Sequence, residues 1–233
     1  SEILTVFALV RSMKSLALFI GFFFLIPSVF AADSTKVRKK FLVAGLNAVA
    51  YKGSLQSSYA RWTPAYQIAL KFEKKKIING MVSLTFGQVI GEDRTYSLPS
   101  KAVQTLTPVS KFQTQFFALH YEAQLMLFKY HGLRIYASQG IGLFKFTVKD
   151  WDGNNLAGKD KTRSKGESFS ETSTTFPTQI GLTYRFQNDM QLGFQAGVLN
   201  PATAYLDNMK ELANNETGDN IAAFRFQFYY PLK

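Results

Sequence analysis

The sequence contains segments in which apolar and polar side chains alternate residue by residue, and this pattern constrains the fold most. In the segment 221–232, Phe224, Phe226 and Phe228 share one face, while Arg225 and Gln227 share the other. A β-strand repeats every two residues, so one face of this strand is aromatic and the other is polar. A strand of this kind fits a closed sheet with lipid outside and a polar interior. We expect it to be the last element of the fold and to close a barrel.

Seven earlier segments alternate in the same way and predict seven more strands. Their ranges are 41–50, 63–73, 77–90, 112–128, 133–148, 174–186 and 190–199. The alternation in 133–148 shifts phase near Gln139 and Gly140, which predicts a β-bulge there. Together the eight segments predict an all-β fold: an eight-stranded antiparallel up-and-down transmembrane β-barrel with a filled lumen.

The connections between these segments alternate between short and long. Tight hairpins are expected at 74–76, 129–132 and 187–189, and long loops at 51–62, 91–111, 149–173 and 200–220. In outer-membrane barrels the short turns face the periplasm and the long loops face the outside. The pattern therefore predicts a barrel in the bacterial outer membrane, with both chain ends on the periplasmic side.

The beginning of the sequence predicts export. Met13 and Lys14 precede an apolar run from Leu16 to Pro27, and Ala31 is a small residue suited to cleavage. A charged start, a short apolar core and a small residue are the parts of a secretory signal peptide. We expect residues 1–31 to be upstream residues plus a signal peptide, 32–40 a basic leader, and 41–233 the outer-membrane barrel. An uncleaved anchor is the alternative.

Composition agrees with an exported barrel and excludes other classes. The chain has no Cys, which excludes a disulfide scaffold, and 15% of its residues are aromatic. Its mean hydropathy of −0.05 is far below that of a helical membrane protein, whereas alternating strands average to such a value. The net charge of +11 suits anionic lipid headgroups or acidic partners. No motif indicates a nucleic acid partner.

The apolar faces of the strands are expected to contact lipid, and the polar faces to fill the lumen. Charged side chains inside a barrel this narrow must pair, because an unpaired buried charge is costly. Glu122 is expected to pair with one or more of three arginines, most easily Arg134 on the neighbouring strand. The expected lumen polar network comprises Lys71, His120, Glu122, Arg134, Arg185 and Arg225.

His120 and Glu122 share the polar face of one strand and permit two interpretations. One is a hydrolytic pair, as in small barrel lipases that act on lipid A, which also needs a serine oriented by the histidine. Ser83 and Ser138 are the candidates for that serine. The other interpretation is a hydrogen-bonded filling of the lumen without catalysis, for which no catalytic residue, cofactor or metal is expected.

The long loop 149–173 is rich in charged residues. Asp150, Asp152 and Asn154 loosely resemble a calcium loop but lack its regular spacing and its terminal glutamate. A solvated loop is the simpler interpretation. Its basic cluster is expected to form extracellular contacts, including contacts with lipopolysaccharide phosphates, through Lys159, Lys161, Arg163 and Lys165.

Five short segments together resemble a known family. They are Tyr-Lys-Gly-Ser-Leu at 51–55, Thr-Pro-Ala-Tyr at 63–66, Gln-Gly-Ile-Gly-Leu-Phe at 139–144, Pro-Thr-Gln-Ile-Gly-Leu-Thr-Tyr at 177–184 and Tyr-Leu-Asp-Asn at 205–208. In this order they resemble small outer-membrane barrels of Bacteroidota, and among these the PorG-like barrels associated with the type IX secretion system. The resemblance covers most of the chain after residue 31.

The resemblance implies a non-enzymatic barrel that serves as a structural or accessory subunit of an outer-membrane complex. It implies other outer-membrane or periplasmic proteins as partners and supplies no catalytic residues. Two alternatives stay open from the residues themselves. One is a lipid A-modifying enzyme that uses His120, and the other is a soluble lipocalin-like binding barrel with its apolar face inside.

Overall fold

The computed structural model describes residues 39–53, 55–74, 77–92, 110–158, 169–209 and 218–232. The expected signal peptide, most of the expected leader, and Lys159, Lys161, Arg163 and Lys165 lie outside the described residues. Within the described ranges no helix is long and apolar enough to cross a membrane.

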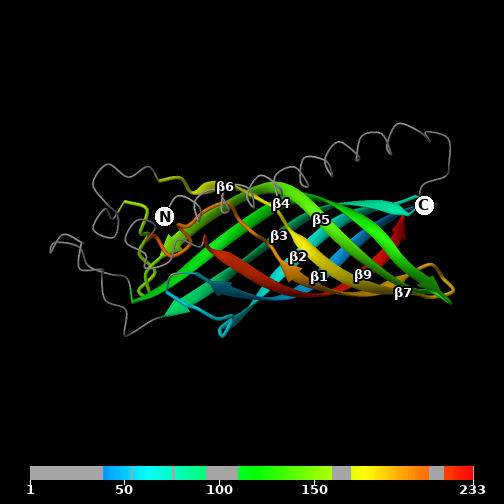
Figure 1. Ribbon diagram of the computed structural model, residues 1–233, viewed down its shortest axis with the longest axis horizontal. Helices are drawn as coiled ribbons and strands as arrows, with labels where there is room; N and C mark the ends of the chain where they lie inside the picture. Colours follow the sequence, from blue (N-terminus) through cyan, green and yellow to red (C-terminus); the bar gives the residue numbers. More distant parts are fainter. Residues whose placement is uncertain are drawn as a thin grey trace, which may run out of the picture. The chain divides into compact units, whose positions relative to one another are not determined.

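The described chain folds into antiparallel strands that close on themselves (Figure 1). Strands that follow one another in sequence pair, except that β6 and β7 both pair with β5, and β1 pairs with β9 to complete the circle. The expected fold, a closed eight-stranded antiparallel barrel, is confirmed. Its elements are β1 (Lys39–Lys52), β2 (Trp62–Glu73), β3 (Ile78–Glu92), β4 (Lys111–Tyr130), β5 (Leu133–Lys149), β6 (Thr172–Thr175), β7 (Thr178–Arg185), β8 (Gln191–Val198) and β9 (Asn220–Leu232).

The short strands β6 and β7 form a single strand of the barrel wall. Both pair with β5, and the register is the same on either side of the break, from Gly142 opposite Thr175 to Gln139 opposite Thr178. The break lies at Pro177, which has no N–H to donate to the ladder. The Pro177 carbonyl nevertheless accepts a 2.8 Å hydrogen bond from the Gly140 N–H. The nine strand segments of the described chain therefore form an eight-stranded barrel wall.

The β-bulge expected near Gln139 and Gly140 is absent from β5, and that expectation was wrong. The β4–β5 register runs without a shift from Gln113 opposite Lys149 to Met126 opposite Tyr136, and the irregularity lies between Met126 and Phe128 in β4. In β5 the even-numbered residues face inward throughout. The interior changes from polar to aromatic along this strand, so the sequence pattern inverts although the backbone phase does not.

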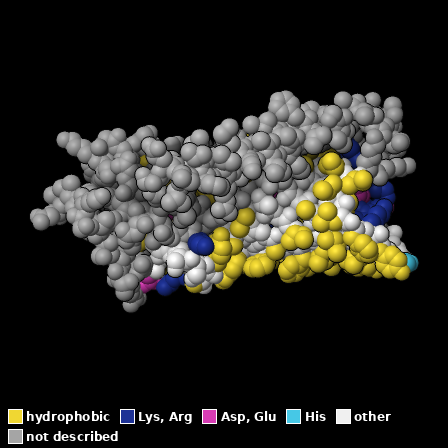
Figure 2. All heavy atoms as spheres, in the orientation of Figure 1, with side chains coloured by type: hydrophobic (Ala, Val, Ile, Leu, Met, Phe, Trp, Pro, Cys, Tyr) yellow, Lys and Arg dark blue, Asp and Glu magenta, His cyan; other side chains and the backbone are white. Residues whose placement is uncertain are grey.

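The outer surface of the barrel is apolar, as expected. Outward side chains such as Leu46, Ile68 and Phe194 are half exposed or more, and hydrophobic side chains cover much of the visible wall (Figure 2). Tyr130, Tyr184 and Tyr230 lie on this surface near the short turns, where membrane barrels carry an aromatic belt. A lipocalin-like barrel would require polar residues outside, so this surface contradicts the soluble alternative.

The lumen is filled at two levels of different chemistry. Toward the short turns it holds polar and charged side chains, together with a small cluster around Phe41, Met81 and Tyr229. Toward the long loops it holds a larger apolar cluster, in which the rings of Phe116 and Phe144 stack at 5.4 Å. The two levels define two candidate sites, one in the polar lumen and one at the loop end.

Candidate functional site

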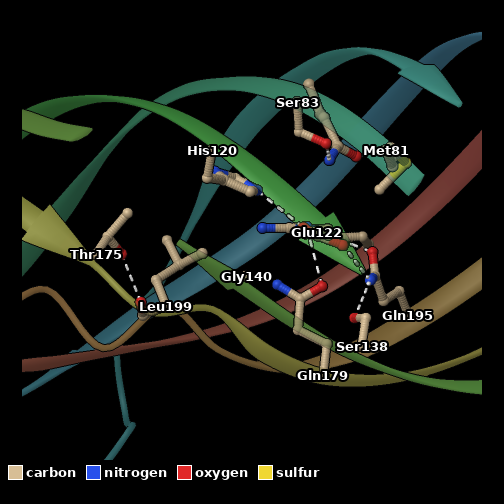
Figure 3. Close-up of polar contacts among 12 residues, drawn as sticks. Met81, Ser83, His120, Glu122, Ser138, Gly140, Thr175, Gln179, Gln195 and Leu199 are labelled. Carbon is tan, nitrogen blue, oxygen red and sulfur yellow. Dashed lines mark hydrogen bonds and ion pairs between the residues drawn. The ribbon is translucent and has the colours of Figure 1, made fainter. Parts of the chain in front are cut away.

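The carboxylate of Glu122 is the centre of the polar lumen (Figure 3). Its Oε1 lies 2.8 Å from Nε2 of His120 and accepts a 3.1 Å hydrogen bond from Nη1 of Arg225. Its Oε2 accepts a 3.1 Å hydrogen bond from Nε2 of Gln195. Glu122 and Arg225 are 0% and 1% exposed, so this is a fully buried ion pair with additional hydrogen bonds. We call Glu122, His120, Arg225, Gln195, Gln179 and Ser138 the lumenal network.

Strand alternation and two glycines place these side chains. His120 and Glu122 are both on the inner face of β4, and Arg225 is on the inner face of β9. Across β5, the register sets Gly142 opposite His120 and Gly140 opposite Glu122. A Cβ at Gly142 would overlap the backbone of Leu119 and the Cβ of His120, so this glycine leaves room for the histidine.

The arginine side chain connects β9 to the rest of the network. Besides Glu122, the Arg225 Nη1 donates to Oε1 of Gln179 at 3.0 Å and to Oε1 of Gln195 at 3.3 Å. Gln195 also donates through Nε2 to Oγ of Ser138 at 3.2 Å. Side chains of β4, β5, β7, β8 and β9 thus meet in one hydrogen-bonded layer across the lumen.

The expected contact between Glu122 and Arg134 does not form, and the strand register explains why. Glu122 lies opposite Gly140, and Arg134 is six residues further along β5 at about 3.3 Å per residue. Arg134 and Arg185 instead both pair with the carboxylate of Glu73 near the short turns. The expected polar set is therefore divided between the lumenal network and a second group, the turn-end cluster of Glu73, Arg134 and Arg185.

Lys71 lies inside the barrel between these two groups. Its side chain is fully buried, and its ammonium group lies over the ring of Tyr229 at 4.8 Å and near that of Tyr136 at 5.6 Å. No hydrogen-bond acceptor for this ammonium group is found among the described residues. The faces of these two tyrosines stabilise the ammonium group by cation–π interactions.

Among the described residues, no serine is hydrogen-bonded to His120. Ser83 is opposite His120 in the register, but its Oγ accepts a hydrogen bond from Gln67. The Oγ of Ser138 accepts from Gln195. Within the described part of the chain, Nδ1 of His120 has no hydrogen-bond partner, and its side chain is buried inside the wall. A hydrolytic pair needs a serine on the histidine and access for substrate.

A segment of the last long loop folds back into the mouth of the barrel. Within residues 199–209, here called the mouth loop, Leu206 and Met209 are fully buried and Tyr205 nearly so. They pack in the apolar cluster at the loop end, together with residues of β1, β4 and β9 such as Tyr51 and Phe112. The mouth loop therefore closes the lumen at this end.

Three acidic and phenolic groups hold the mouth loop in place. The hydroxyl of Tyr51 lies 2.9 Å from the carboxylate of Asp207 and 2.9 Å from that of Asp219. Asp219 accepts a 2.7 Å hydrogen bond from the N–H of Leu206, and Asp207 accepts one of 2.9 Å from Met209. We call Tyr51, Asp207 and Asp219 the mouth triad.

Burial and the neighbouring Asp207 carboxylate raise the pKa of Asp219 well above its ordinary value. The geometry agrees with a shared proton. The Tyr51 hydroxyl has one hydrogen and can donate it to one carboxylate only, so the second short contact is satisfied when the other carboxyl is protonated. A Cβ at Gly53 would overlap the Tyr51 hydroxyl and the Asp219 carboxylate, which explains the glycine there.

Sequence reasoning missed the mouth triad and the role of Glu73. Glu73 follows Lys71 by two residues, so alternation alone places both on the inner face of β2. For the mouth loop, the available signal was a group of large apolar residues, Tyr205, Leu206 and Met209, inside a long loop. An exposed loop has no need of such residues, and they indicate burial.

The suggested calcium loop is a turn held by its own side chains. Both carboxylate oxygens of Asp150 accept hydrogen bonds from Asn154, one from the backbone N–H at 2.8 Å and one from Nδ2 at 3.0 Å. The described residues contain no group of three His, Asp or Glu side chains placed to hold a metal ion. Asp152 is exposed on this turn.

Comparison with known proteins defines the fold. No family model and no curated protein matches the sequence. Among solved structures, Neisserial surface protein A is 13% identical with a TM-score of 0.50, and the match covers 83% of this chain and 98% of that one. Ail of Yersinia pestis, in complex with the heparin analogue sucrose octasulfate, is 8% identical with a TM-score of 0.48 (84% and 100% covered). The outer membrane enzyme PagL is 13% identical with a TM-score of 0.37 (82% and 99% covered).

The closed strand circle, the apolar outer wall and the filled polar lumen define a small outer-membrane β-barrel. Every backbone polar group of such a closed wall is paired, which is the condition for crossing a bilayer with strands. The protein is located in the bacterial outer membrane.

Proposed function

We propose that this barrel is a non-enzymatic structural or accessory subunit of an outer-membrane protein complex, of the PorG-like kind that accompanies type IX secretion. The observation that carries the proposal is the doubly closed lumen. The lumenal network fills one level, and the mouth loop fills the other. A barrel closed in this way conducts no solute, so its outer wall, turns and loops are the surfaces left for function.

Two segments of the family resemblance contribute to one contact, which supports the same proposal. Tyr51 and Leu55 come from the first segment, and Tyr205, Leu206 and Asp207 come from the last. They share the apolar cluster at the mouth and the hydrogen bond from Tyr51 to Asp207. A shaped, closed mouth presents a fixed extracellular surface on which a partner protein can dock.

A pull-down from outer membranes tests the proposal. The tagged protein is extracted in mild detergent, and co-purified proteins are identified by mass spectrometry beside an equally abundant tagged barrel as a control. We expect secretion or assembly subunits that are enriched over the control. Recovery of the barrel without enriched partners, also after chemical cross-linking in intact cells, would contradict an accessory role.

A lipid A-modifying enzyme is the second candidate, favoured by the 2.8 Å contact between His120 and Glu122. A carboxylate on the histidine is one part of a hydrolytic triad. Because neither Ser83 nor Ser138 forms a hydrogen bond with His120, we expect His120→Asn to leave the lipid A of the cells unchanged. Mass spectrometry of lipid A from wild-type, His120→Asn and deletion strains measures this. Lipid A that differs from the wild type in the same way in the His120→Asn and deletion strains, with normal barrel abundance in the variant, would establish the enzyme.

A further inference from the structure

A groove at the turn end of the barrel combines lysines with lipid-facing apolar side chains. It has a volume of about 660 Å³ and is lined by Lys39 and Lys40 of β1, Asn188 and Asp189 of the turn before β8, and Tyr230 and Leu232 of β9. Lys and Arg side chains lie at this end of the barrel next to the hydrophobic wall (Figure 2). Neither the lumenal network nor the mouth triad includes these residues.

The strand register places Lys40 on the lipid-facing surface. Lys40 lies opposite Leu232 in β9 and opposite Phe72 in β2. Outward residues of β1 alternate with inward ones, and Phe41 is the next inward residue. The side chain of Lys40 therefore starts from an apolar surface near Tyr230. It is exposed, and its ammonium group can extend toward the lipid headgroups.

Positively charged side chains outnumber negatively charged ones in the groove. Nζ of Lys39 lies 3.0 and 2.9 Å from the two carboxylate oxygens of Asp189, and Nη1 of Arg185 lies 3.7 Å from the same carboxylate. The hydrogen bond from Lys39 lowers the pKa of Asp189, which keeps that carboxylate ionised and Lys39 oriented. Lys40 has no ion pair among the described residues. Because Arg185 is paired with Glu73, the described charges of the groove are Lys39 and Lys40 against Asp189, which leaves a local excess of one positive charge.

We propose that this groove binds the headgroup phosphate of an anionic glycerophospholipid in the periplasmic leaflet. Lys40 and the excess positive charge beside it bind the phosphate, and the side-chain amide of Asn188 can donate a further hydrogen bond to it. Tyr230 and Leu232 contact the acyl chains. A soluble phosphate could use the lysines but not the apolar wall. The groove lies where the lipid-facing surface ends at the turns, at the level of a phospholipid headgroup. The site does not depend on the accessory role proposed above.

Lipid retention in native mass spectrometry tests this site. The purified full-length barrel is released from mixed micelles that contain equal amounts of phosphatidylglycerol and phosphatidylcholine, and the bound lipids are counted. We expect the wild-type barrel to retain phosphatidylglycerol preferentially. Lys40→Gln is expected to reduce that preference about fivefold, as one lysine near an anionic surface contributes about 1 kcal/mol. Lys40→Arg should keep it, because the charge is kept.

Lys145→Gln is the matched control, because Lys145 is also an exposed outward lysine of the wall but is near the long loops. It should retain phosphatidylglycerol like the wild type. Equal retention of both lipids by the wild type, or equal losses in Lys40→Gln and Lys145→Gln, would overturn the site. Displacement of the bound lipid by millimolar inorganic phosphate would show that the groove recognises phosphate without the acyl chains, and would also overturn it.

Discussion

Replacement of Glu122 by glutamine is expected to lower the free energy of unfolding of the barrel by about 3 kcal/mol, because it leaves a buried arginine without its counter-charge. Glu122 accepts from Arg225 at 3.1 Å, and both side chains are buried in the lumen. Glutamine keeps the shape but only one acceptor oxygen, so the loss combines the missing charge with one hydrogen bond of the carboxylate. Urea unfolding in phospholipid vesicles, followed by the fluorescence of Trp62 and Trp151, measures the change.

Two further variants make this prediction specific. Asp152→Asn removes a carboxylate from an exposed turn and should change the free energy of unfolding by less than about 0.5 kcal/mol. Arg225→Met added to Glu122→Gln should recover part of the loss, since a buried ion pair can be replaced by neutral groups at little cost when both partners go. A single variant Glu122→Gln as stable as the wild type would show that the pair contributes nothing net.

The strands were predictable because each carries its signal locally. The expected segment 112–128 became β4 at Lys111–Tyr130, and the expected segment 63–73 became β2 at Trp62–Glu73. Lipid on one side and a polar filling on the other impose a period of two on every strand, whatever its neighbours are. The same period divided inward from outward side chains correctly, including His120, Glu122 and Arg225.

The expected pairing of Glu122 with one of three arginines is confirmed by Arg225. Which arginine it pairs with was not predictable, because that depends on how far adjacent strands are staggered. Arg134 is on the strand next to Glu122 but lies lower in the barrel, and its partner Glu73 is 61 residues away in sequence. Arg185, the second partner of Glu73, is 112 residues away. The stagger of a barrel is a property of the closed ring as a whole, which no single segment encodes.

The mouth loop shows the same limit for irregular structure. Its contact between Tyr51 and Asp207 joins residues 156 positions apart and follows no period. The segment Tyr-Leu-Asp-Asn at 205–208 is one of the segments that carry the family resemblance, but its burial depends on the apolar mouth that receives it. The sequence of a loop without periodicity does not indicate where the loop packs. Its position depends on the complementary surface that receives it.

The docking of the mouth loop is expected to weaken as the pH rises. The docked loop holds Asp219 at a pKa above its ordinary value, whereas a released loop returns this carboxyl to water and to that ordinary value. Between the two pKa values the docked state binds more protons than the released state. The stabilisation is therefore fully present below the ordinary pKa of an aspartate, and it is lost as the pH rises through the raised pKa of Asp219.

Hydrogen exchange of the mouth loop measures this effect. The N–H of Leu206 donates to Asp219 and the N–H of Met209 donates to Asp207, so both report on docking. After correction for the intrinsic pH dependence of exchange, we expect their protection to fall by as much as about tenfold per pH unit within the window. Amides in the middle of β9 should keep their protection, because the barrel wall stays closed.

Asp219→Asn separates the charge from the shape of the contact. The amide oxygen can still accept from Leu206, and the amide N–H₂ can donate to Asp207 or to the Tyr51 hydroxyl, so docking should persist without an ionisable group at this position. The protection of Leu206 should then become nearly independent of pH and exceed that of the wild type at high pH. An unchanged pH profile in this variant would assign the titration to another group, and protection lost at every pH would show that the carboxylate itself is required. If the profile flattens as expected, one buried proton of the mouth triad determines whether the loop end of this barrel is closed.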